Sequence, residues 1–172
     1  MPNPTPDGLK VVEAIQRDIP SIRTFILDAW MIAGPSAWGW TGASEENVQA
    51  LASGEHLAGL ISGSKVRVLL AKEDGRVVGF AATREFDPET IELAGMIVDE
   101  YHTRRGVGTA LAKRALELAA NHGYKGAVVK TEVFNRRAIG FYESNGFVRA
   151  GTAAEDVDGK KVELVLLRRR LK

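Results

Sequence analysis

The spacing of hydrophobic residues along the chain is helical in some segments and typical of strands in others. After Asp18, a plausible N-cap, large apolar residues recur at helical spacing until Gly34-Pro35 ends the pattern. These residues are Ile19, Ile22, Ile26 and Trp30. A second helix is predicted from near Ser44 to Gly63, with an apolar side formed by Leu51, Leu57, Leu60 and Ile61.

From Val66 onward the pattern changes to short β-rich runs separated by turns. Asp-Gly pairs at 74–75 and 158–159 are typical of tight hairpin turns. Later segments return in part to helical spacing. We predict strands at residues 9–15, 65–72, 77–84, 91–98, 127–132, 147–152 and 161–168, and helices at residues 106–122 and 135–144.

The order of these elements predicts an α/β (α+β) fold with a mixed, mostly antiparallel central sheet of about seven strands flanked by four helices. Hairpin connections make the first central strands antiparallel. The strand–helix–strand unit over residues 91–132 should be a right-handed parallel crossover. Gly95 interrupts its first strand, and an isolated glycine in a strand often marks a bulge or a close backbone approach.

Composition narrows the function without choosing one. The chain has 172 residues, which fits one domain over residues 1–172, with residues 1–8 as a proline-punctuated, flexible lead. It contains no cysteine, which excludes disulfides, zinc–thiolate sites and a cysteine nucleophile. There is no signal-peptide pattern and no long apolar run, so we expect a cytoplasmic protein with no membrane contact.

Other charged and titratable residues support no separate function. The net charge of +1 gives no strong field for nucleic acid, and the basic end at 168–170 is expected to be solvated. His56, His102 and His122 lack the spacing of metal ligands, so no metal is expected.

A glycine-containing turn before the helix at 106–122 is the clearest candidate for binding chemistry. Helix N-termini present unpaired N–H groups and a positive dipole end to anions. Glycines at 106 and 108 let the backbone approach an anion closely, while Arg104, Arg105 and Thr109 add charge and a donor. The same glycines would also suit a simple strand-to-helix turn. The pattern matches neither a P-loop nor a dinucleotide fingerprint.

Two motifs together resemble the GNAT superfamily of acetyl-CoA-dependent N-acetyltransferases. The turn at 103–109 is similar to the family's Arg/Gln-x-x-Gly-x-Gly/Ala loop, with Thr103 in place of the leading Arg or Gln. The segment at 135–147 is similar to its Asn-x-x-Ala-x-x-x-Tyr-Glu-x-x-Gly-Phe signature. The resemblance covers nearly the whole chain and implies a GNAT-like sheet in which a splayed parallel strand pair holds the cofactor.

The resemblance also implies which residues contact acetyl-CoA. Main-chain groups of the strand ending at Val98 should meet the acetyl and pantetheine groups, and an N–H there could polarise the thioester carbonyl. The diphosphate should bind the turn. The expected cofactor-binding residues are Met96, Ile97, Val98, Thr103, Arg104, Arg105, Gly106, Val107, Gly108, Thr109, Asn135 and Tyr142. Asn135 would equally serve as the N-cap of its helix.

Glu92 and Tyr142 are the candidate catalytic residues. Acyl transfer to an amine needs a group that removes a proton from the ammonium, and the leaving thiolate benefits from a proton donor. Glu92 lies at the spacing of the base in some family members, although others use ordered water. Strand alternation would place it with Ala94, Met96 and Val98, opposite Leu93 and Ile97. Tyr142 corresponds to the family's acid, or it simply packs against Phe141 and Phe147.

The sequence leaves the acceptor amine open. A polyamine or other small amine, an amino acid or antibiotic, and a protein N-terminus or lysine all fit. Trp38 and Trp40 lie in a loop that would border an acceptor channel, or they form a core or dimer contact. The alternative function is a non-catalytic acyl-CoA sensor on the same fold. Family members are often dimers, so a homodimer is a further possibility.

Overall fold

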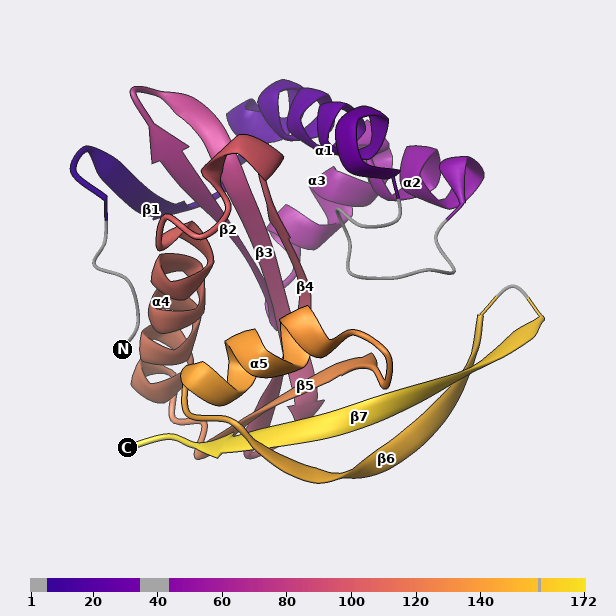
Figure 1. The fold of residues 1–172 in the computed structure, drawn as a ribbon. Coiled ribbons are helices and arrows are strands. Elements are labelled where there is room, and N and C mark those ends of the chain that lie inside the picture. The colour runs from indigo at the N-terminus through magenta and orange to yellow at the C-terminus, as the bar shows by residue number, and fades with distance from the viewer. Residues whose placement is uncertain (1–5, 35–43, 158) are drawn as a thin grey trace.

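One mixed sheet organises the protein. The computed structural model describes residues 6–34, 44–157 and 159–172. Its seven strands lie in the order β1-β2-β3-β4-β5-β7-β6, as predicted in number and in being mostly antiparallel (Figure 1). The strands are β1 Leu9–Glu13, β2 Val66–Glu73, β3 Arg76–Asp87, β4 Thr90–Val98, β5 Gly126–Glu132, β6 Val148–Val157 and β7 Lys160–Arg170.

Helices cover both faces of the sheet and enclose two hydrophobic cores. They are α1 Ile19–Ala33, α2 Glu45–Leu51, α3 Gly54–Ser62, α4 Val107–Asn121 and α5 Arg136–Ser144. One core contains α1, α2 and α3 residues such as Ile22 and Leu57, and the other contains α4 and α5 residues such as Leu111 and Ile139. The apolar stripes read from the sequence therefore face the sheet from opposite sides. No helix in the described ranges is both long and apolar enough to cross a membrane.

The predicted second helix is in fact two helices, α2 and α3, which raises the helices in the described residues from the expected four to five. Ser53 has an extended backbone between them, and its hydroxyl accepts a hydrogen bond from the His56 N–H at 3.2 Å. A serine in this position begins a new helix, because its side chain satisfies an N–H that lacks a carbonyl partner. The apolar spacing continues across the break and so hides it.

Asp18 precedes α1 as predicted, but its carboxylate does not cap that helix. It accepts hydrogen bonds from the Lys72 ammonium at 2.8 Å and from the Ile15 N–H at 2.9 Å. The lysine on β2 competes successfully for the carboxylate, so this side chain ties α1 to the sheet. The predicted N-cap position of Asp18 is confirmed, while its side chain forms no capping hydrogen bond.

The parallel pair of β4 and β5 parts after a short ladder. Register pairs run from Thr90 with Gly126 to Glu92 with Val128, and β4 has no pairing with β5 beyond that point. On its other edge β4 continues to pair with β3 as far as Val98. The predicted splayed parallel pair is thus present, and from Leu93 onward the β5-facing edge of β4 has no strand partner among the described residues.

A β-bulge in β4 accompanies the splay and changes which side chains share a face. Ala82 pairs with Gly95 and Thr83 pairs with Leu93, so Ala94 is the extra residue. Leu93 packs in the α4–α5 core, whereas Ile97 packs in the α1–α3 core. The predicted alternation, which put these two residues on one face, is wrong because the extra residue reverses it. Glu92 is therefore on the opposite face from Met96.

Gly79 fixes the position of α4 over the sheet. A methyl group at this residue would lie 2.9 Å from side-chain carbons of both Val107 and Leu111. Real packing does not tolerate such a distance, so a glycine is needed for the first turns of α4 to approach β3 this closely. The close approach holds the N-terminus of α4 beside the opening between β4 and β5.

Candidate active site

A large cavity occupies the region where β4 and β5 part. Its volume is about 1080 Å³, and its wall includes residues from both helical layers. From the α1–α3 side come residues such as Leu57 and Leu60, and from the α4–α5 side come Gly108 and Tyr142. Figure 1 shows α5 crossing the sheet near this region, with the β6–β7 hairpin extending beyond it. The cavity is large enough for an extended ligand together with a second small molecule.

The N-terminus of α4 forms one end of this cavity and is suited to an anion. Gly106, at the N-cap, has a φ of 87°, and the helix has neither a side-chain cap nor an acidic residue in its first turn. The positive φ explains why this position carries glycine. Gly106, Gly108 and Thr109 all line the cavity. Unpaired N–H groups and the positive end of the helix dipole are therefore directed to a cavity that could hold a phosphate.

Gly108 and Phe141 are in close contact. A methyl group at Gly108 would lie 3.2 Å from the Phe141 ring and 3.7 Å from the Met96 sulfur. The first turn of α4, the splayed part of β4 and helix α5 therefore meet at one point. Phe141 was expected only to pack against Tyr142 within the motif, yet it also lines the cavity.

The structure brings most of the predicted cofactor-binding residues together. Those that line the cavity are Met96, Val98, Thr103, Arg104, Gly106, Gly108, Thr109, Asn135 and Tyr142. The side chains of Ile97 and Val107 are instead buried in the cores. The Arg105 guanidinium lies 3.6 Å from the Glu73 carboxylate. These last three residues are not among those that line the cavity, so their contact with a cofactor stays a prediction.

Two polar residues of the expected cofactor site already have local partners. The Thr103 hydroxyl donates to the Glu100 carbonyl at 3.0 Å, so its hydrogen is engaged within the turn. The Asn135 side-chain oxygen accepts from the Ala138 N–H at 3.0 Å and caps α5. The N-cap interpretation of Asn135 is confirmed. Its position in the cavity wall also leaves it beside any ligand bound there.

Tyr142 combines burial with access to the cavity. Its ring makes edge-to-face contacts with Phe141 and Phe147, at centroid distances of 5.1 and 5.7 Å. Burial raises the pKa of its phenol to about 12. Within the described ranges no group forms a hydrogen bond with its hydroxyl, and the residue lines the cavity. The phenol is therefore protonated at neutral pH and available as a donor.

Glu92 belongs to a row of four charged side chains that crosses the sheet. Its carboxylate accepts from the Arg84 Nε at 2.8 Å and lies 3.8 Å from the Lys130 ammonium. Lys130 in turn binds the Glu155 carboxylate at 2.7 Å. We call Arg84, Glu92, Lys130 and Glu155 the charged row. All four line the cavity, and the buried Glu92 carboxylate has an arginine and a lysine as its partners.

Three members of the charged row and one buried acid were not predicted from the sequence. Arg84 pairs with Glu92 in the β3–β4 register, which could have been found by aligning that hairpin. Lys130 and Glu155 come close only through the fold. Glu132, at the end of β5, is buried and lines the cavity. A carboxylate at the carboxyl end of a parallel strand was the available signal for it.

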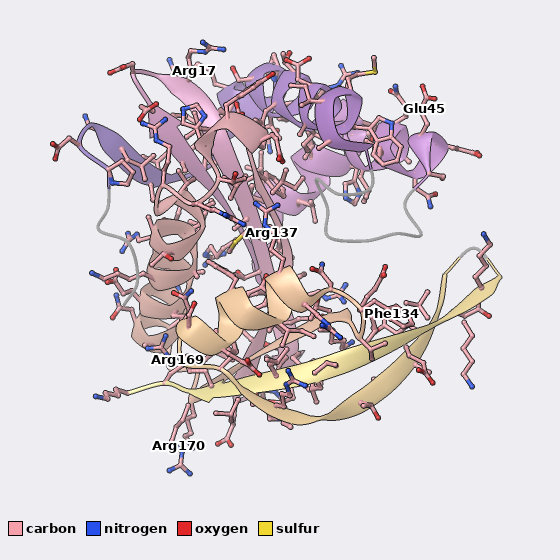
Figure 2. The ribbon with its side chains drawn as sticks, in the orientation of Figure 1. Arg17, Glu45, Phe134, Arg137, Arg169 and Arg170 are labelled. Carbon is pink, nitrogen blue, oxygen red and sulfur yellow. The ribbon has the colours of Figure 1, made fainter. Side chains whose placement is uncertain are left out.

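Other predicted site residues are placed differently or lie elsewhere. Trp38 and Trp40 are outside the described residues. Two residues for which the sequence predicted no role are labelled in Figure 2: Phe134, which is exposed between β5 and α5, and Arg137 of α5, which lines the cavity. Residues 168–170 belong to β7, where Arg168 and Arg170 are exposed, as expected of a solvated end, and Arg169 donates to the Asn145 carbonyl at 2.6 Å. In the described ranges no three His, Asp or Glu side chains are grouped as metal ligands.

Comparison with known proteins identifies the class to which this fold and cavity belong. The chain matches the acetyltransferase (GNAT) family over residues 24–147, and it is a member of that family. It is 30% identical to a mycothiol acetyltransferase of Acidimicrobium ferrooxidans over 157 residues, which are 86% of this chain and 47% of that relative. It is 38% identical to N-acetylaspartate synthetase of Rattus norvegicus over 81 residues, 46% of this chain and 27% of the relative.

The chain thus matches less than half the length of either of these curated relatives. Solved structures cover it more fully. The PaiA N-acetyltransferase from Thermoplasma acidophilum, in complex with coenzyme A, matches 94% of this chain and 98% of its own, with a TM-score of 0.72 and 19% identity. The ribosomal-protein-S18-alanine N-acetyltransferase from Escherichia coli matches 95% of this chain and 94% of its own, with a TM-score of 0.70 and 16% identity. These similarities establish a shared fold.

Proposed function

We propose that this protein transfers an acetyl group from acetyl-CoA to a primary amine by direct attack in a ternary complex. The observation that carries the proposal is the uncapped N-terminus of α4, which opens into the cavity between the splayed strands. Family membership and the coenzyme A bound by a structural neighbour support the choice of substrate. A sensor that only binds acyl-CoA has no need of Glu92 and Tyr142 in the same cavity.

The cofactor arm would run from α4 along the free edge of β4. The diphosphate would accept hydrogen bonds from first-turn N–H groups at Gly106 and Gly108, with Arg104 nearby. The pantetheine and acetyl groups would then follow Val98, Ile97 and Met96. Beyond Glu92 the backbone groups that point toward β5 pair with no strand in the part of the chain that the structure describes, so the amides of the arm would bind them. One such N–H would stabilise negative charge on the thioester oxygen.

The chemical step joins the amine nitrogen to the thioester carbonyl carbon and then breaks the carbon–sulfur bond, whose electron pair leaves on sulfur. The amine must lose a proton before attack. In this proposal Glu92 accepts that proton, either directly or through a water molecule. Tyr142 holds its proton until about pH 12 because burial raises its pKa, so it can donate to the departing sulfur. After attack the nitrogen loses a second proton. Of the two protons that leave the nitrogen, one restores the phenol of Tyr142 after it has protonated the sulfur, and the other is released to solvent from Glu92.

The proposed function is tested by assaying CoA release from acetyl-CoA with a panel of primary amines, with mass detection of the acetylated product. We expect at least one amine to be acetylated stoichiometrically with CoA release. Binding of acetyl-CoA, measured by calorimetry without an amine, should precede turnover. Binding without transfer to any amine would favour the acyl-CoA sensor, and absence of both would overturn the proposal.

A further inference from the structure

Arg84 has hydrogen-bonding capacity beyond its contact with Glu92. Its Nε donates to the Glu92 carboxylate, but the two terminal nitrogens of the guanidinium form no hydrogen bond with any described residue. The side chain is 56% exposed and lines the cavity. Glu92 also raises the pKa of the Arg84 guanidinium through this hydrogen bond. The Arg84 guanidinium is therefore permanently charged and held in place at Nε, and its two terminal nitrogens remain as donors for a ligand in the cavity.

The other three charged side chains of the row are paired with one another. Lys130 lies between the two carboxylates, at 3.8 Å from Glu92 and 2.7 Å from Glu155. The row therefore contains two cations and two anions, and the spare donors are at its Arg84 end. A ligand with several ammonium groups would find no surplus of negative charge there. A ligand carboxylate, in contrast, would find a planar guanidinium fork with two free donors.

We infer that the acceptor is a free amino acid whose carboxylate binds the terminal nitrogens of Arg84 while its amine lies beside Glu92. This inference rests on the proposed acetyl transfer. The carboxylate and the amine of an α-amino acid are attached to one carbon, and Arg84 and Glu92 are cross-strand neighbours in contact. The arginine–glutamate pair is thus complementary to a zwitterion in charge and in spacing. A peptide N-terminus or a polyamine lacks the adjacent carboxylate.

The position of Arg84 separates this role from cofactor binding. It pairs with Glu92 near the start of β4, whereas the turn that would bind the diphosphate follows Val98 at the other end of that strand. The acceptor would therefore enter from the end of the cavity opposite the cofactor's phosphates. Glu92 would both orient the guanidinium and face the reacting amine. Arg84 sets specificity: it exchanges no proton with the reactants and acts on them only through its own contacts and its hydrogen bond to Glu92.

The test compares matched acceptors. Phenylalanine with phenethylamine, and leucine with isoamylamine, differ only in the carboxylate. For the wild-type protein we expect kcat/KM to favour the amino acid of each pair by at least about tenfold, the effect of losing a charge-assisted hydrogen bond. In Arg84→Gln the preference should disappear, mainly through a higher KM, with acetyl-CoA binding by calorimetry unchanged.

Arg149→Gln is the matched control. Arg149 is also largely exposed and donates from Nε to a glutamate, Glu143, at 2.8 Å, but neither residue lines the cavity. This variant should keep the wild-type preference. If the wild-type protein acetylates the decarboxylated amines equally well or better, the inference is overturned while the proposed function stands. If acetyl-CoA neither binds nor reacts, the proposed function fails and the inference fails with it.

Discussion

Glu92 on β4 and Val128 on β5 form the last register pair of the parallel ladder, so the candidate base lies where the two strands part. The bulge at Ala94 follows within the same strand. Pairing with β5 therefore fixes the backbone at Glu92, while the next residues of β4 leave their edge open to a ligand. This arrangement places a buried carboxylate beside the expected position of the thioester.

Glu92→Gln is expected to lower kcat by about 100-fold at neutral pH, because an amide cannot take a proton from the attacking amine. The pH dependence of the rate should also change, since the proton would then go directly to solvent. CoA release measured across the pH range checks this. Glu143→Gln removes a carboxylate that also binds an arginine but lies outside the cavity, and it should behave as wild type. An unchanged pH–rate profile in Glu92→Gln would exclude the base role.

Tyr142→Phe is expected to reduce kcat by about 100-fold where chemistry limits the rate, because the departing sulfur loses its donor. The aromatic contacts with Phe141 and Phe147 remain, so the fold should be kept. Single-turnover measurements distinguish the chemical step from product release. Full single-turnover activity in this variant would mean that Tyr142 serves in packing alone.

The same phenol predicts a pH dependence of stability. Its folded-state pKa, raised by burial, is about 12 against an ordinary value of 10.0. A raised pKa means that the stabilisation is fully present below pH 10.0 and is lost as pH rises through about 12. The free energy of unfolding should fall by about 2–3 kcal/mol in total. Between these pH values the free energy of unfolding, measured with urea, should fall more steeply with pH for the wild-type protein than for Tyr142→Phe. Equal slopes would contradict the assigned burial, and the exposed Tyr101→Phe serves as control.

Gly108→Ala should weaken acetyl-CoA binding by at least about tenfold, because a methyl group there meets the Phe141 ring at 3.2 Å and narrows the approach to the helix N-terminus. Gly59→Ala is the matched control, since it changes a helical glycine with open space around it. Calorimetry gives the two dissociation constants. Equal affinities would indicate that no ligand approaches Gly108 closely.

Local signals in the sequence were sufficient for most of the fold. The Asp74-Gly75 pair predicted the β2–β3 hairpin, and both residues adopt the positive φ values, 50° and 80°, that such a turn needs. The positive φ of Gly106 similarly bears out a glycine requirement before α4. These elements were predictable because the residues that determine them are adjacent in the chain.

Features that depend on residues far apart in the sequence could not be predicted in this way. The bulge at Ala94 arises from the register between β3 and β4, so strand alternation assigned Leu93 and Ile97 to the same face and failed. The charged row joins residues of four strands, and the sequence showed only Glu92. Ser53 begins α3 within a continuous apolar pattern, which therefore suggested one helix instead of two.

The most direct test of the account is a crystal structure of the protein with coenzyme A bound. We predict that the diphosphate accepts hydrogen bonds from backbone N–H groups in the turn at Gly106 and Gly108, with the pantetheine arm beside the free edge of β4. A diphosphate bound elsewhere on the protein, with this turn empty, would contradict the central claim.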